Sequence, residues 1–300
     1  MNQIILSEKL TVSRIALGFW RVKNWNFTTN QLLNYIESAL DKGITTFDHA
    51  DIYGDFQAET IFGNALKQKP SLREKMQLVT KCGIQPLYRD IPGKRVKFYD
   101  TSFQHIVKSV DQSLKNFNTD YIDLLLIHRA DPLMNPEETA RAFDALKQAG
   151  KVLHFGVSNF SFMEFEMLNR YTSEPLITNQ VEISPYTLEH FENSNMAFFL
   201  KEKIHPMAWS PLAGGKLINP VDEKSKRINE ALMDLANRLN IPSIDTLVYA
   251  WLLHHPAGII PIIGSGKIER MNSALAAFDI NLTTEMWYEI YEASLGQPVP

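Results

Sequence analysis

The 300-residue sequence contains one cysteine, Cys82, and this scarcity excludes two kinds of structural support. A single cysteine cannot form an internal disulfide bond, and it cannot supply the sulfur ligands of a cysteine-based zinc site. We therefore expect no structural metal, and we expect the protein in a reducing cytoplasm.

Long hydrophobic runs and a strong excess of one charge are also lacking. No apolar run approaches the roughly 20 residues that span a bilayer. The opening residues, MNQIILSEKL, lack the basic and then apolar pattern of a signal peptide. The net charge of −4 gives no reason to expect nucleic acid or an anionic membrane as a partner.

Apolar segments typical of strands alternate with helical patterns along the whole chain. Strands are expected at residues 15–19, 44–47, 76–80, 121–127, 152–157, 176–181, 204–209 and 258–263. Helices are expected at residues 29–42, 58–66, 102–117, 136–149, 161–169, 224–239, 244–255, 267–277 and 284–293, with one more between residues 181 and 204.

This alternation predicts an α/β protein in which residues 1–300 form a single (β/α)8 TIM barrel domain with an extra C-terminal helix. An open doubly wound sheet is the alternative, but no Gly-x-Gly-x-x-Gly motif follows the first strand. Residues 83–101 and 210–223 are expected to form long active-site loops.

Polar side chains stand at or just past the ends of three apolar runs: Asp48 and Tyr53, Lys81, and His128. In a barrel the carboxyl ends of the strands share the face where catalysis occurs. An ammonium near a phenol lowers the phenol's pKa, so we expect Lys81 to lower the pKa of Tyr53. Asp48 would hold Lys81, and His128 would orient a substrate oxygen. Such a set can protonate an alkoxide as it forms, and it needs a hydride donor.

Seven segments extend this pattern and resemble the aldo-keto reductase superfamily. They are GITTFDHADIYG, LVTKCG, LLLIHRADP, GKVLHFGVSNF, NQVEISP, AWSPLAGG and IPIIGSGKIER. They occur in the family's order over nearly the whole chain, and the chain most resembles the bacterial YdhF-like oxidoreductases. The resemblance implies a barrel that binds NADPH without a Rossmann domain. It also implies that Asp48, Tyr53, Lys81 and His128 are the catalytic residues, with Tyr53 as the acid.

The resemblance also implies a set of cofactor contacts. Ser158, Asn159 and Gln180 match positions that bind the carboxamide, and Trp209 matches the aromatic that stacks on the nicotinamide. Residues at the pyrophosphate and the 2′-phosphate are Ser210, Leu212, Lys216, Gly264, Ser265, Gly266, Lys267 and Arg270. Gly264 departs from the family, where a lysine is common, so the NADPH preference depends on Lys267 and Arg270.

The substrate is expected to be a small carbonyl compound, and the sequence identifies it no further. Trp20 and Trp25 are expected to line the substrate mouth, although no motif marks them. We expect a monomer or a weak homo-oligomer, as is common among relatives of this kind.

Other interpretations of the same residues remain open. Asp48, His49 and Asp51 could bind a hydrolytic metal, and Lys81 could form a Schiff base. Cys82 could be a reactive thiolate or a small buried residue. Arg129 and Asp131 are best interpreted as ion-paired residues of a structural loop. Glu59 is best interpreted as a structural or solvated charge. Lys267 and Arg270 could be a solvated helix face.

Two function classes follow. The first is an NADPH-dependent carbonyl reductase, whose residues serve the oxidative direction equally. The second is a cofactor-sensing module of the same fold with little turnover, such as an ion-channel subunit.

Overall fold

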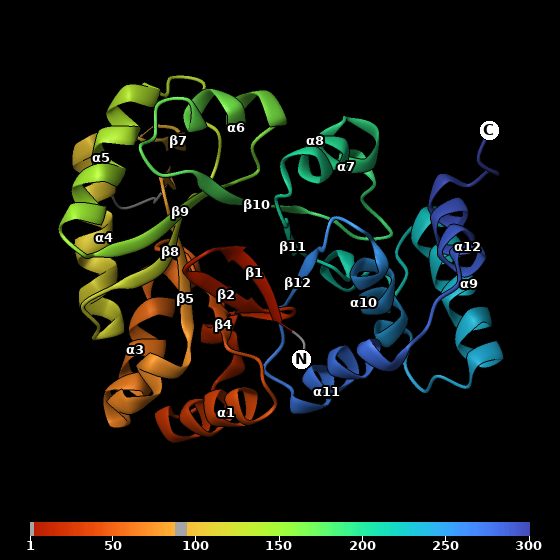
Figure 1. Cartoon of the computed structure of the whole chain (residues 1–300). Coiled ribbons are helices and arrows are strands. Elements are labelled where there is room, and N and C mark those ends of the chain that lie inside the picture. Colours follow the sequence, from red (N-terminus) through yellow and green to blue (C-terminus); the bar gives the residue numbers. More distant parts are fainter. Residues whose placement is uncertain (1–2, 88–94) are drawn as a thin grey trace. The chain divides into compact units, whose positions relative to one another are not determined.

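The computed structural model describes residues 3–87 and 95–300 (Figure 1). Part of the expected loop at residues 83–101 lies outside the described residues. Contacts within the chain group it into two compact units. The amino-terminal unit holds residues 5–12 and 17–179, and the carboxyl-terminal unit holds residues 3–4, 13–16 and 180–300. That residues 1–300 form one domain stays a prediction.

Eight described strands close into a barrel, in the order β10, β11, β12, β3, β4, β5, β8 and β9. This confirms the predicted (β/α)8 architecture and rules out the open sheet. The barrel strands are β3 (Ala16–Gly18), β4 (Thr46–Asp48), β5 (Gln77–Cys82), β8 (Ile122–Ile127), β9 (Val152–Ser158), β10 (Leu176–Glu182), β11 (Met207–Trp209) and β12 (Ile260–Ile263).

Helices follow the barrel strands much as predicted. In the amino-terminal unit they are α1 (Thr29–Asp41), α2 (Tyr53–Phe56), α3 (Ala58–Gln68), α4 (Phe103–Phe117), α5 (Pro136–Gln148) and α6 (Phe162–Asn169). In the carboxyl-terminal unit they are α7 (Glu189–Glu192), α8 (Asn195–Glu202), α9 (Glu223–Leu239), α10 (Ile244–His254), α11 (Ile268–Ala276) and α12 (Thr284–Leu295). The single helix expected between residues 181 and 204 is two short ones, α7 and α8.

Two small sheets and four 3-10 helices were not predicted. The sheets pair β1 (Gln3–Ser7) with β2 (Leu10–Ser13), and β6 (Ile84–Gln85) with β7 (Phe98–Tyr99). The 3-10 helices are η1 (Val22–Trp25), η2 (Pro70–Lys75), η3 (Ala213–Gly215) and η4 (Ala277–Asp279). These segments are too short to show a helical or strand periodicity in the sequence.

Local chemistry sets the helix ends in the amino-terminal unit. Thr28 and Gln31 form a reciprocal capping box at the start of α1, with nitrogen to oxygen distances of 2.8 and 3.2 Å. The helix stops before Gly43, whose φ of +82° suits glycine. The next strand of the barrel, β4, begins three residues later at Thr46.

All six residues of β8 are buried, which explains why this segment is almost continuously apolar. Its one charged residue, Asp123, faces Arg73 at 2.7 Å and accepts the Leu78 amide at 2.9 Å. The hydrogen bonds of Asp123 are therefore made within the fold, near the start of β8. His128 follows the other end of this strand.

Helices α3 and α4 touch at Gly63. A Cβ at this position would lie 1.9 Å from the Asn116 carbonyl oxygen and 2.8 Å from the Phe117 Cα. An alanine side chain would therefore collide with backbone, which cannot rotate aside. Glycine permits an approach that no other residue allows.

We expect Gly63→Ala to destabilise the protein by about 2 to 3 kcal/mol, although alanine is the better helix former by about 1 kcal/mol in exposed sites. Equilibrium unfolding in urea measures the change. Thr60→Ala, at an exposed position of the same helix, is the matched control and should be neutral or slightly stabilising. A Gly63→Ala protein as stable as the wild type would contradict the close approach.

Candidate functional site

The four predicted catalytic residues come from neighbouring strands of the amino-terminal unit. Asp48 is the last residue of β4, Lys81 lies in β5, His128 follows β8, and Tyr53 begins α2. Strand β4 pairs in parallel with β5, and β5 pairs in parallel with β8. Their carboxyl ends therefore share one edge, and the structure brings all four side chains together there.

Lys81 is the centre of the group and is fully buried. Its Nζ lies 2.7 and 2.8 Å from the two Asp48 carboxylate oxygens. It also donates to the His49 carbonyl at 2.7 Å and approaches the Tyr53 hydroxyl at 3.4 Å. An ammonium has three N–H donors, so these partners use its full capacity.

The electrostatics of this group favour a charged Lys81. Burial alone lowers the pKa of Lys81, but the Asp48 carboxylate and the Tyr53 oxygen outweigh burial and leave the pKa raised. Lys81 is therefore a fixed positive charge beneath the phenol.

The net pKa of Tyr53 is raised, which corrects the expectation from the sequence. Burial of the phenol is the largest cause, and it outweighs the lowering by Lys81, while Asp48 raises the pKa further. Sequence analysis identified the ammonium but could not show the cost of burying a phenolate. A raised pKa keeps Tyr53 protonated at neutral pH, as a general acid must be.

His128 lies against Tyr53 and is held in its neutral form. The two ring centroids are 5.7 Å apart with the rings edge to face. Burial, and then the charges of Lys81 and Arg129, hold the pKa of His128 well below its ordinary value. Its Nδ1 is buried without a hydrogen-bond partner among the described residues. A neutral imidazole can donate one N–H to a substrate oxygen.

Backbone strain follows Tyr53 directly. Gly54, Asp55 and Phe56 have φ values of +57°, +56° and +63°, a left-handed conformation that two of the three adopt at a cost. Lys23 holds this turn through a 3.0 Å ion pair to Asp55. The strain lies where the chain must present the phenol.

The two tryptophans expected at the substrate mouth lie in different surroundings. Trp20 is 58% exposed, and its ring centroid is 6.4 Å from that of Tyr53. Trp25 instead packs on Phe19, Phe27 and Tyr35, at centroid distances of 5.4, 5.7 and 5.6 Å. Only Trp20 has a described contact with a predicted catalytic residue.

Two of the residues predicted to bind the cofactor's carboxamide, Ser158 and Asn159, lie in the same unit as the four predicted catalytic residues. Ser158 ends β9 and is buried, and Asn159 follows it with φ at +58°. The Asn159 Nδ2 donates to the Ser158 hydroxyl at 2.8 Å and to the His128 carbonyl at 3.3 Å. Asn159 therefore ties the end of β9 to the end of β8.

Other predicted cofactor residues belong to the carboxyl-terminal unit. Gln180 is buried in β10 and donates to the Met207 sulfur at 3.9 Å, and Trp209 ends β11. Ser210 has φ at +50°, and Leu212 is half-buried before η3. The Lys216 ammonium lies 4.5 Å from the centre of the Tyr186 ring. Parallel pairing of β10, β11 and β12 places their carboxyl ends on one edge.

The predicted phosphate segment leads into α11. Gly264, Ser265 and Gly266 precede the helix, and open space surrounds Gly264. Lys267 is the N-cap residue and is exposed, and no side chain caps the helix. Arg270 forms a 2.7 Å ion pair with the buried Asp245, a structural role that sequence analysis did not predict. An uncapped helix start beside a lysine fits a phosphate group.

Two alternative chemistries do not fit these contacts. The His49 ring is enclosed by Phe19, Phe62 and Phe117 at centroid distances of 4.6, 4.6 and 5.0 Å. No three described His, Cys, Asp or Glu side chains are arranged to hold a metal ion. A Schiff base needs a neutral lysine amine, and Lys81 is held charged with its donors in use.

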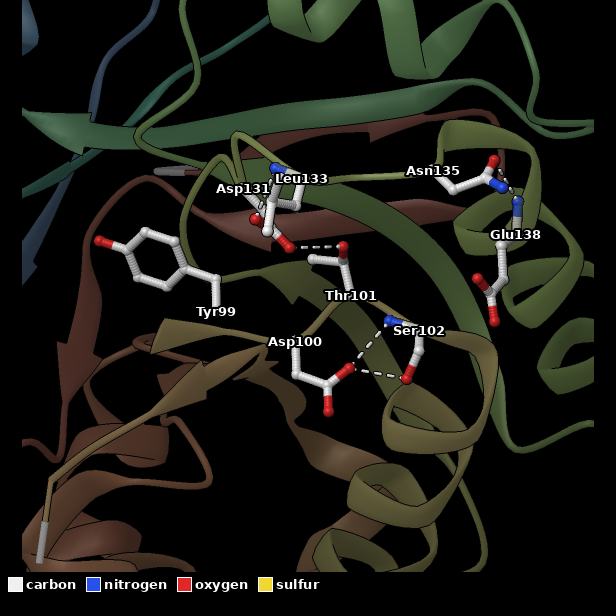
Figure 2. A pocket seen from close by; sticks show the side chains of 8 residues that line it. All are labelled: Tyr99, Asp100, Thr101, Ser102, Asp131, Leu133, Asn135 and Glu138. Carbon is white, nitrogen blue, oxygen red and sulfur yellow. Dashed lines mark hydrogen bonds between the residues drawn. The ribbon is translucent and has the colours of Figure 1, made fainter. Parts of the chain in front are cut away.

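A small pocket near the loops after β5 and β8 is a structural feature. It has a volume of about 150 Å³ and is lined by Tyr99, Asp100, Thr101, Ser102, Asp131, Leu133, Asn135 and Glu138 (Figure 2). Asp131 accepts from Thr101 at 3.1 Å and from the Leu133 amide at 2.9 Å. Ser102 and Asn135 cap α4 and α5. Its polar atoms thus hold loops and helix ends, in agreement with the structural interpretation of Asp131.

Sequence analysis missed a polar group behind Lys81, which we call the rear cluster: the buried Glu59, Thr80 and Ser109 and the half-buried Asp51 and Asn116. Glu59 is 1% exposed and accepts from Thr80 at 2.7 Å and from Asn116 at 3.0 Å. Ser109 donates to Asp51 at 2.8 Å. The signal was serine at positions 109 and 113, four residues apart on the face of α4 that is buried. Glu59 is thus a buried residue and not a solvated charge.

A family of known proteins matches this chain along most of its length. The model of the Aldo/keto reductase family matches residues 14–294. The chain belongs to the aldo/keto reductase family. It is therefore an oxidoreductase that uses a nicotinamide cofactor, as the resemblance of its motifs predicted.

Three similar proteins cover essentially the whole chain of this aldo/keto reductase. It is 49% identical to the uncharacterized oxidoreductase YcsN of Bacillus subtilis (strain 168) over all of both chains. It is 46% identical to the oxidoreductase YdhF of Escherichia coli (strain K12), over 96% of this chain and 95% of that one. The structure of the glycerol dehydrogenase from Gluconobacter oxydans matches with a TM-score of 0.84 and 25% identity, covering 100% of this chain and 98% of that one.

In the part of the chain that the structure describes, no helix combines the length and apolar character needed to cross a membrane.

Proposed function

We propose that this aldo/keto reductase reduces aldehydes or ketones to alcohols with NADPH, and that Tyr53 is the general acid. The observation that carries the proposal is the contact between the Tyr53 phenol and a fully buried Lys81–Asp48 pair. A protonated phenol above a fixed ammonium is suited to give a proton to an oxygen that becomes an alkoxide.

Each catalytic residue has a separate part in this proposal. Tyr53 donates its proton to the carbonyl oxygen, and the Lys81 charge stabilises the phenolate that remains. Asp48 keeps Lys81 charged and in place, as the 2.7 and 2.8 Å contacts allow. His128, held neutral, donates a hydrogen bond that orients the carbonyl. The same residues serve alcohol oxidation by microscopic reversibility.

The bound nicotinamide supplies the hydride, and several residues have the chemistry to hold it. The Ser158, Asn159 and Gln180 side chains offer donors and acceptors for a carboxamide, and Trp209 offers an aromatic face. The uncapped start of α11, the Ser210 hydroxyl, the Lys216 ammonium and the Leu212 backbone N–H suit phosphate oxygens. Exposed Lys267 favours the extra phosphate of NADPH, whereas Arg270 is shared with Asp245.

NADPH consumption, followed by absorbance, tests the proposal. The panel comprises small aldehydes including glyceraldehyde, ketones, dicarbonyls and quinones, with NADH as the competing cofactor. We expect turnover that prefers NADPH. Tight NADPH binding without turnover on any carbonyl, by a stable tetramer, would favour a cofactor-sensing module instead.

We expect Lys267→Ala to raise the KM for NADPH roughly fivefold to tenfold, which corresponds to the loss of one exposed contact to a phosphate. The KM for NADH should stay unchanged, because NADH lacks the 2′-phosphate. Lys226→Ala removes an exposed lysine that pairs with Glu223 and is the matched control. Equal changes for both cofactors would contradict a 2′-phosphate contact. Arg270→Ala is less informative because it also leaves Asp245 buried without its partner.

A further inference from the structure

The rear cluster places two more carboxylates, those of Asp51 and Glu59, within electrostatic reach of Lys81. Asp51 follows β4, and its Oδ1 is shielded from solvent. Glu59 lies in α3, and the charges of Glu59 and Lys81 both act on Asp51. The Asp51 backbone N–H donates to the Lys81 carbonyl at 2.9 Å, so the carboxylate is anchored directly behind the lysine strand.

Lys81 cannot neutralise these carboxylates by direct contact. Its three N–H donors already serve Asp48, the His49 carbonyl and the Tyr53 hydroxyl. One buried cation therefore faces the carboxylates of Asp48, Asp51 and Glu59. Burying two uncompensated negative charges is costly, and the usual response is that a carboxyl group takes up a proton.

Hydrogen bonds indicate which of the two carboxyl groups holds the proton. Glu59 accepts from Thr80 and Asn116, and Ser113 also bonds to it. Asp51 has one described side-chain donor, Ser109. Fewer donors stabilise the charged form less, so Asp51 is the group that protonates first.

We propose that Asp51 is a positioning residue that gains or loses one proton behind Lys81, and that this proton controls how readily Tyr53 releases its own. The inference deepens the proposed function and depends on it. Neutral Asp51 leaves the Lys81 charge free to stabilise the Tyr53 phenolate. Ionised Asp51 offsets that charge and slows proton donation. The proton is exchanged with solvent, and no electrons move.

The groups that face Asp51 act on its pKa in opposite directions, and the net effect raises it. The pKa of Asp51 is raised to about 7, with burial as the largest cause. Ser109 in α4, the Ile52 amide and Lys81 in β5 lower this pKa, and Glu59 in α3 raises it. Cys82, also in β5, has its own pKa raised well above the ordinary range by burial and stays a neutral thiol. The pKa of Tyr53 is raised and that of His128 is lowered, so both move away from neutral pH, whereas burial raises the pKa of Glu59 as it does that of Asp51.

Profiles of kcat against pH, from about pH 5 to about pH 9, test the inference. In the wild type, kcat for carbonyl reduction should fall through a midpoint near 7 as pH rises. Asp51→Asn mimics the protonated carboxyl and should remove that midpoint, leaving the rate at its high plateau. Glu59→Gln should move the midpoint down, and Ser109→Ala should move it up, each by about one pH unit.

Asp111→Asn is the matched control, because Asp111 also lies on α4 but forms a half-exposed ion pair with Lys151. Its profile should match the wild type. Identical midpoints in the wild type, Glu59→Gln and Ser109→Ala would overturn the inference, as would a midpoint that survives in Asp51→Asn.

A second measurement needs no turnover and separates this inference from the proposed function. A carboxyl group whose pKa is raised by folding binds its proton more tightly in the folded state. The folded protein should therefore lose stability as pH rises from the ordinary aspartate pKa toward 7. Asp51→Asn should reduce that loss in denaturant unfolding. An unchanged pH dependence of unfolding would show that Asp51 does not hold the proton, whether or not the enzyme turns over.

Discussion

Tyr53→Phe should lower kcat for carbonyl reduction by about two to four orders of magnitude, the usual contribution of a positioned proton donor. Phenylalanine keeps the ring that packs edge to face on His128 at 5.7 Å but removes the hydroxyl, which accepts from Lys81 and carries the acidic proton. Binding of NADPH, followed by fluorescence, should change less than about twofold, because the cofactor contacts are proposed at other residues.

Tyr99→Phe is the control for this experiment. Tyr99 is half-buried and lines the pocket in Figure 2, so its hydroxyl should have no part in turnover. If Tyr53→Phe keeps the wild-type kcat, then the proton comes from elsewhere and the proposed mechanism is wrong. If both variants lose activity together, the effect is structural.

Lys81→Met should destabilise the folded protein by about 3 to 5 kcal/mol, the range for removing one partner of a buried ion pair. The side chains of Lys81 and Asp48 are 0% and 4% exposed, so the Asp48 carboxylate would remain buried without its cation. The Tyr53 hydroxyl and the His49 carbonyl would lose their donor as well. Urea unfolding measures the change, and turnover should be lost in parallel.

The double variant Lys81→Met with Asp48→Asn separates the charge from the packing. A neutral amide no longer needs the ammonium, so the double variant should recover much of the stability that Lys81→Met loses. Equal stability of Lys81→Met and the wild type would contradict the close contacts at Lys81. If the double variant lost as much stability as Lys81→Met and Asp48→Asn together, the two charges would not be coupled.

The sequence predicted the barrel because its signals are local. The almost continuously apolar run that became β8 and the capping residues around α1 depend on neighbours within a few positions. The same applies to the four predicted catalytic residues, since each lies at or shortly past the end of a recognisable strand, and parallel pairing brings strand ends together.

The remainder depended on contacts between distant segments. The net pKa of Tyr53 reflects burial that is created only when the strands and loops pack around it. The rear cluster joins residues 51, 59, 80, 109 and 116. The sequence around Ser109 in α4 does not indicate that its partner, Asp51, lies in the loop after β4. The ion pair between Arg270 and Asp245 links two separate helices, so the sequence presented Arg270 as a cofactor residue or part of a solvated helix face, and not as the partner of a buried carboxylate.

The hydrogen bond from Lys81 to the His49 carbonyl gives the site a form of mutational robustness. Substitution at position 49 replaces a ring enclosed by phenylalanines but keeps the backbone oxygen on which the ammonium rests. The side chain at position 49 can therefore vary to suit the aromatic packing, while the lysine keeps one of its three anchors. Evolution at this strand end can act on the hydrophobic core and on the charged centre independently.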